Sequence, residues 1–145
     1  MADKTQRSII IEATTQQVMS VIADLESYPE WVSAAKSVEV LDKDADGRAH
    51  TARFVLDAGV VKDSYTLSYT WRPDAKAVSW TLLSGELQKG QDGSYELSEQ
   101  PDGSTEVVYT LTVDLNIPMI GMFKRKAEKV ITDTALKELK KRVEG

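Results

Sequence analysis

The chain has 145 residues, of which 41% are hydrophobic and 28% charged, and its formal net charge is −5. This size and composition fit one globular domain, expected to span residues 1–145 around one core. The acidic balance argues against binding nucleic acid, no apolar run reaches the roughly 20 residues that cross a bilayer, and the absence of cysteine excludes disulfides and thiolate chemistry.

The N-terminal part predicts a short strand over Ser8–Glu12, followed by an amphipathic helix. Thr14 and Gln17 have the spacing of a capping box, which marks the start of that helix. Its apolar stripe comprises Val18, Val21, Ile22 and Leu25.

The stretch "DLESYPEWV" ends this helix. Pro29 fixes its own φ and disfavours helix at Tyr28, so the chain turns there. Tyr28 and Trp31 place two large rings beside the turn, which indicates that the segment covers apolar surface.

Residues 36–116 change to a period-two pattern, typical of strands. Five turn sequences break it: "DKDADG", "DAGV", "RPDA", "LSGE" and "QPDG". They predict six consecutive antiparallel strands, with a bulge at Lys89–Ser94. One face is apolar and the other rich in Ser and Thr, as in a half-solvated sheet; the third of these strands shows it best, with an apolar side made of Tyr65, Leu67, Tyr69 and Trp71.

The last predicted element is a helix from Pro118 to about Val143. Its first apolar stripe comprises Ile120, Phe123, Ala127, Val130, Ile131 and Thr134. Later apolar residues drift around the axis, and these are Ala135, Leu139 and Val143. We expect this helix to lie across a strongly curved sheet.

This order of elements, together with "DLESYPEW" and the following "VEVL", resembles the START-like SRPBCC superfamily. Within it, the chain looks closest to the bacterial polyketide cyclase/dehydrase and lipid-transport group. The resemblance implies an α+β helix-grip fold. In that fold a curved seven-stranded antiparallel sheet wraps a long C-terminal helix, two short helices follow strand one, and an apolar cavity lies between sheet and helix. Tyr28 and Trp31 would then cap the cavity or plug the edge of the core.

Few residues offer chemistry. The residues Asp42, Asp44, Asp46 and Gly47 match part of a calcium loop, but Arg53 stands where the bidentate Glu should be, so an acidic hairpin turn is the better interpretation.

His50 is the single histidine. Alternation puts it on the side of Phe54, near the end of its strand, where a rim or surface position is expected. Arg53 falls on the outer face and Arg72 beside a proline, so we predict no catalytic residue, no metal site and no cofactor.

The aromatic residues are the strongest feature. Two observations favour space beside them: the last helix offers small residues, Ala127 and Thr134, and buried tyrosine hydroxyls need partners. The predicted ligand-binding residues are Trp31, Phe54, Tyr65, Tyr69, Trp71, Trp80, Tyr95, Tyr109, Met122, Phe123 and Ala127.

We therefore expect binding or transport of a hydrophobic or amphipathic small molecule, such as a lipid or a polyketide-like compound. One alternative is a polyketide cyclase, aromatase or dehydratase, which needs an inward acid, base or arginine. Another is a protein-interaction module with a filled interior. The terminal sequence "MADKTQRSIII" lacks the apolar core of a signal peptide, so a cytoplasmic location without integral membrane association is expected.

Overall fold

The computed structural model describes residues 4–57, 62–115 and 121–145, without the side chains of residues 115, 121–128, 130 and 131. Within these residues, seven strands form one antiparallel sheet in the order β1-β7-β6-β5-β4-β3-β2. The elements in chain order are β1 Lys4–Ile11, α1 Thr15–Ala23, the 3-10 helix η1 Leu25–Glu30, β2 Ala35–Lys43, β3 Ala49–Asp57, β4 Lys62–Trp71, β5 Ala77–Gly85, β6 Gln88–Glu99, β7 Thr105–Leu115 and α2 Gly121–Glu144.

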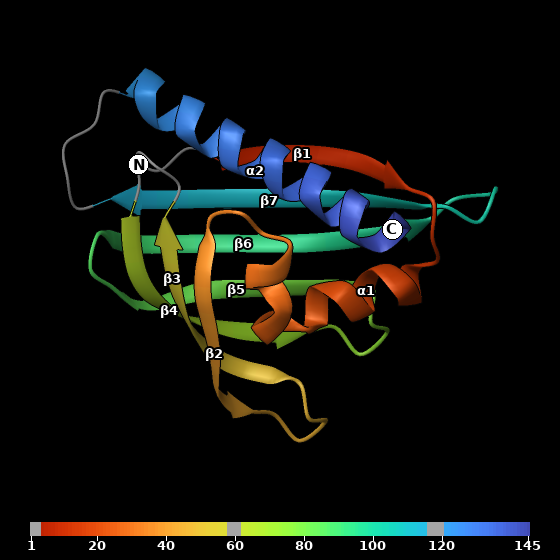
Figure 1. Ribbon diagram of the computed structural model, residues 1–145, viewed down its shortest axis with the longest axis horizontal. Coiled ribbons are helices and arrows are strands. Elements are labelled where there is room, and N and C mark those ends of the chain that lie inside the picture. The colour runs from red at the N-terminus through yellow and green to blue at the C-terminus, as the bar shows by residue number, and fades with distance from the viewer. Residues whose placement is uncertain (1–3, 58–61, 116–120) are drawn as a thin grey trace.

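The sheet is strongly curved. Figure 1 shows β2 and β3 running across the direction of β6 and β7, with α2 lying over β1 and β7. Register shifts in the β2–β3, β4–β5 and β6–β7 pairs accompany this bend. The register shift in β6 falls between Gln88 and Gly90. The predicted bulge is therefore confirmed, at the start of the predicted segment Lys89–Ser94. The α+β helix-grip architecture and the six-strand meander are confirmed.

The predicted capping box begins α1. The backbone nitrogen of Gln17 donates to Thr14 Oγ1 at 3.1 Å, and the backbone nitrogen of Thr14 donates to Gln17 Oε1 at 2.9 Å. The helix buries Val18, Met19 and Ile22 against the core. The strand before it is longer than predicted, because Lys4 to Arg7 also pair with β7 although they lack an apolar pattern.

Replacing the cap tests this local account. We expect Thr14→Ala to lower the free energy of unfolding by about 1 kcal/mol, because the N-terminal amides of α1 lose their acceptor. Urea denaturation measures the change. Gln16→Ala, on the exposed side of the same helix, should shift it by less than about 0.5 kcal/mol; equal shifts in the two variants would contradict the capping role.

Helix α2 is fixed along its C-terminal half. Lys140 Nζ donates to the carbonyl oxygen of Ile10 at 2.7 Å, and the backbone nitrogen of Glu12 donates to Glu144 Oε2 at 2.8 Å. On the opposite side Arg142 pairs with Glu30 at 3.0 Å. The C-terminal half of α2 is therefore held between β1 and η1. None of the described helices has the length and apolar character needed to cross a membrane.

One prediction for α2 is wrong. Thr134 is exposed, and the buried residues of this half are Thr132, Leu136 and Leu139. At 100° per residue, Thr134 lies about 200° from Thr132 and from Leu136, on the opposite side of the helix. The later stripe holds better, with Leu139 buried and Ala135 and Val143 half-buried. Thr134 therefore gives no evidence for space above the sheet.

Candidate functional site

The inner face of the sheet carries aromatic rings that touch one another in series. Phe54 stacks on Tyr65 with ring centroids 5.4 Å apart. Further along, Tyr69 lies 5.8 Å from Trp80, whose ring in turn lies 5.5 Å from that of Tyr95. We call the whole set the aromatic cluster; it comprises Tyr28, Trp31, Phe54, Tyr65, Tyr69, Trp71, Trp80, Tyr95 and Tyr109.

The turn after α1 supplies one end of the aromatic cluster. The Tyr28 ring meets Trp31 edge-on at 5.1 Å and approaches Phe54 at 6.3 Å. The Tyr28 hydroxyl donates to the carbonyl oxygen of Ile22 in α1. Tyr28 and Trp31 are half-buried and pack against the core, so η1 covers apolar surface as its sequence predicts.

Four tyrosine hydroxyls lie inside without a partner among the described residues. Tyr65, Tyr69, Tyr95 and Tyr109 are each at most 8% exposed. Within the described part of the chain, no group forms a hydrogen bond with any of the four hydroxyls. Burial raises the pKa of each phenol above its usual range, because the charged form would lose its hydration.

This burial predicts an unusual alkaline titration. The pKa of Tyr28 is also raised, chiefly by burial, so the pKa is raised for all five tyrosines of the chain. In the folded protein we expect no tyrosinate absorbance near pH 10, where unfolded tyrosines ionise. The folded state then holds more protons than the unfolded state, so stability is full below about pH 10 and falls as the pH rises further. Spectrophotometric titration with and without urea measures both effects, and a phenol that titrates near pH 10 in folded protein would contradict them.

A chain of polar side chains crosses the same face. Trp80 Nε1 donates to Gln91 Oε1 at 2.8 Å, and Gln91 Nε2 donates to Gln88 Oε1 at 2.5 Å. We call these three side chains the amide relay. Gln88 and Gln91 are 4% and 9% exposed, so the relay is buried. Both glutamines face inward because the bulge at Lys89 changes the alternation of β6 between them.

Asp63 is the one buried carboxylate among the described residues. Its Oδ1 accepts from the backbone nitrogen of Leu87 at 2.8 Å, and its Oδ2 accepts from that of Gln88 at 3.1 Å. Both oxygens therefore fasten the start of β6 to β4. This arrangement makes Asp63 a structural anchor, because each of its oxygens accepts from a backbone amide.

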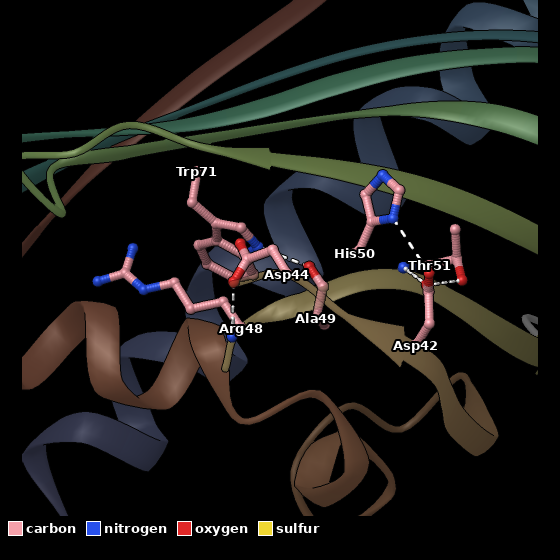
Figure 2. A network of polar contacts seen from close by, with 7 residues as sticks. All are labelled: Asp42, Asp44, Arg48, Ala49, His50, Thr51 and Trp71. Atoms are coloured by element: carbon pink, nitrogen blue, oxygen red, sulfur yellow. Dashed lines mark hydrogen bonds and ion pairs between the residues drawn. The ribbon is translucent and has the colours of Figure 1, made fainter. Parts of the chain in front are cut away.

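His50 lies outside the aromatic cluster, in the polar network that Figure 2 shows. Its Nδ1 is 3.2 Å from Asp42 Oδ2, and its side chain is 51% exposed. Asp42 also accepts from the Thr51 hydroxyl. The hydrogen bond from Thr51 is the larger cause, and the contact with His50 the next, that holds the pKa of the Asp42 carboxyl below its usual range. The surface position predicted for His50 is confirmed. Its predicted side is wrong, because register shifts around Asp42 bury Ala49 in its place.

The same network contains Trp71 and the acidic turn "DKDADG". Trp71 Nε1 donates to the carbonyl oxygen of Ala49 at 2.7 Å, and the Arg48 guanidinium lies 5.5 Å from the Trp71 ring (Figure 2). Asp44 Oδ1 accepts from the backbone nitrogens of Asp46 and Arg48, which closes a hairpin turn. Within the described residues, no group of three or more acidic or histidine side chains could hold a metal ion. The interpretation of "DKDADG" as a hairpin turn is confirmed.

The two arginines of interest both face outward. Arg53 is exposed, with its guanidinium nitrogens 3.4 Å from Ser64 Oγ. Arg72 forms an ion pair with Asp74 at 2.8 Å, and its side chain is 51% exposed. No lysine, arginine or histidine is buried among the residues whose side chains are described.

The structure brings most predicted site residues together. The aromatic cluster contains the eight from Trp31 to Tyr109, while the side chains of Met122, Phe123 and Ala127 lie outside the described residues. The buried polar residues that were not predicted include Asp63, Gln88 and Gln91. Asp63 lies two residues before Tyr65 in β4, so strand alternation could have predicted that it faces inward. The inward orientation of the two glutamines could not be predicted in this way, because it depends on the position of the bulge.

The outer face of the sheet also has a depression, of about 400 Å³, lined by short hydroxyl side chains such as Ser79, Thr81 and Thr110. The charged residues at its margin, Lys4 and Asp92, are exposed. This depression is open rather than enclosed, so we place the candidate site on the inner face.

Comparison with known proteins supports the same fold. A family model described as polyketide cyclase/dehydrase and lipid transport matches residues 11–140. No curated protein gives a significant match.

Solved structures resemble nearly the whole chain. A START superfamily protein from Mycobacterium smegmatis has a TM-score of 0.91 at 20% identity, with 97% of each chain covered. The Zhui aromatase/cyclase from a Streptomyces species has a TM-score of 0.84 at 13% identity, covering 99% of this chain and 94% of its own. A protein from Thermus thermophilus has a TM-score of 0.82 at 23% identity, with 97% of each chain covered. At these identities the likeness shows the fold.

Proposed function

Because the chain belongs to the polyketide cyclase/dehydrase and lipid-transport family, we propose that it is a carrier that binds an apolar or amphipathic small molecule between the sheet and α2. Membership of this family suggests either hydrophobic ligand binding or polyketide cyclisation. The residues of the inner face support binding rather than cyclisation.

One observation supports the proposal most: the four buried hydroxyls of Tyr65, Tyr69, Tyr95 and Tyr109 have no partner in the described part of the chain. An unsatisfied buried polar group costs roughly 1–3 kcal/mol. Four of them would cost about 4–12 kcal/mol, which approaches the whole stability of a typical domain, about 5–15 kcal/mol. Water or the polar end of a ligand beside these hydroxyls would remove this cost, which supports the proposal.

The surrounding rings would supply the affinity. Apolar surface contributes about 25 cal/mol per Å² when a ligand covers it. We propose that the ligand's body lies along Phe54, Tyr69, Trp80 and Tyr109, with Trp31 and Trp71 at the margin. Met122, Phe123 and Ala127 of α2 remain in the proposed binding set.

The charged residues argue against catalysis. A cyclase needs an inward acid, base or arginine within reach of its substrate. Arg53 and His50 are exposed, and both oxygens of Asp63 are occupied by backbone amides. Aromatic rings, phenols and amides suit holding a molecule better than transforming it.

Binding of Nile red, an uncharged apolar dye, tests the proposal. We expect saturable fluorescence enhancement with the wild-type protein and at least about tenfold weaker binding with Tyr69→Ala, because the ring contact and hydroxyl are both lost. Thr70→Ala, the neighbouring residue on the exposed face, is the matched control and should bind as the wild type does. Absence of dye binding by folded wild-type protein would instead favour an interaction module with a filled interior.

A further inference from the structure

The amide relay has a fixed direction. The Trp80 indole nitrogen can only donate, so the Gln91 atom 2.8 Å away is its carbonyl oxygen. The other end of that amide is then Nε2, a donor, so the Gln88 atom 2.5 Å from it is Oε1. The remaining group of Gln88 is therefore its side-chain NH₂.

The NH₂ of Gln88 is a donor that has no acceptor among the described residues. Gln88 is 4% exposed, and nothing in the described part of the chain accepts a hydrogen bond from Nε2. A buried amide with both N–H groups unpaired is costly. An acceptor atom that does not belong to the described chain would remove this cost.

The electrostatics around this donor favour an uncharged acceptor. Among the described side chains no cation is buried, so a carboxylate brought here would lose its hydration without an ion pair. The Asp63 carboxylate is bound to the backbone of the same residue, since its Oδ2 accepts from the backbone nitrogen of Gln88 at 3.1 Å. A second negative charge would be repelled, whereas a ketone, ester or amide oxygen would not.

We propose that Gln88, oriented by Gln91 and Trp80, selects ligands whose polar end is an uncharged carbonyl oxygen, and discriminates against carboxylates. The inference rests on the proposed function, because it concerns the ligand of the same site. The Trp80 ring, which begins the amide relay, contacts Tyr69, Tyr95 and Tyr109. An apolar body lying on these rings would place its carbonyl oxygen toward Gln88.

Three probes with one ring system separate shape from polarity: 2-acetylnaphthalene, 2-isopropylnaphthalene and 2-naphthoate. They carry a ketone, an alkyl group of similar shape and a carboxylate on the same ring. For the wild-type protein, titration calorimetry should show that the ketone binds about tenfold more tightly than the hydrocarbon. The reason is that only the ketone accepts a hydrogen bond from the otherwise unpaired donor. The carboxylate should bind at least about tenfold more weakly than the ketone.

Two variants locate the preference. Gln88→Met keeps the volume but removes the donor, so it should bind the ketone and the hydrocarbon with equal affinity. Gln16→Met, an exposed glutamine on α1, should leave all three affinities unchanged. In ¹H–¹⁵N spectra of the wild type, the side-chain NH₂ signal of Gln88 should move downfield with the ketone and not with the hydrocarbon.

The outcomes distinguish this inference from the proposed function. If none of the three probes binds folded wild-type protein, the carrier proposal fails with it. If the hydrocarbon binds as tightly as the ketone, or the naphthoate binds best, the site exists but Gln88 does not select a carbonyl. The comparison of the three probes and the NH₂ shift both use wild-type protein, so they test the proposal even if Gln88→Met fails to fold.

Discussion

Gly93→Ala is expected to lower the free energy of unfolding by about 2–3 kcal/mol, a large effect for one methyl group. A Cβ at Gly93 would lie 2.3 Å from Cε2 and Cζ2 of Trp80, the cross-strand neighbour. The indole cannot move aside cheaply, because Tyr69, Tyr95 and Tyr109 pack around it. Its displacement would also break the bond to Gln91. Urea denaturation measures the loss.

Gly90→Ala is the matched control in the same strand. A Cβ there meets only the Asp114 Cβ at 3.5 Å, an ordinary contact, so a change below about 1 kcal/mol is expected. Adding Trp80→Leu to Gly93→Ala should cost less than the sum of the two single changes, because the clash disappears with the indole. Equal destabilisation at Gly90 and Gly93, or strict additivity with Trp80→Leu, would contradict the proposed contact.

The second large effect is expected at Asp63. Asp63→Ala should destabilise the protein by about 3 kcal/mol, because the amides of Leu87 and Gln88 lose their acceptors in a buried setting. Hydrogen exchange should accelerate at these two amides before it does elsewhere in β6. Urea denaturation gives the energy, and NMR-detected exchange gives the location.

Asp114→Ala provides the comparison for this variant. Asp114 is 48% exposed and reaches Lys89 only at 3.9 Å, so a change within about 0.5 kcal/mol is expected. Unchanged exchange at Leu87 and Gln88 in Asp63→Ala would show that Asp63 does not anchor the start of β6.

Local sequence patterns predict much of this fold. The spacing of Thr14 and Gln17 specifies the start of α1, and turn residues mark the ends of the strands in the meander, because these signals act over a few residues. The length of β1 could not be predicted, since Lys4 to Arg7 are strand residues only through their pairing with β7. The prediction for Thr134 was wrong because it extended the stripe of residues 120–131, whereas the C-terminal half of α2 buries Thr132, Leu136 and Leu139.

The apolar residues of the candidate site were predicted from the sequence, and its polar residues were missed. Alternation placed Tyr65, Tyr69 and Trp80 on one face, because period two is the direct geometry of a strand. Bulges defeat that rule: one puts Gln88 inward beside Gln91, and register shifts near Asp42 turn His50 outward. A pattern with fixed period cannot locate the extra residue, which depends on how the whole sheet bends.

A high-resolution crystal structure of the protein as purified would show what lies beside the four buried tyrosine hydroxyls. We expect electron density for water or an organic molecule within about 3.2 Å of the hydroxyls of Tyr65, Tyr69, Tyr95 and Tyr109. An interior packed solid, with these hydroxyls bonded to protein groups and no further density beside them, would contradict it.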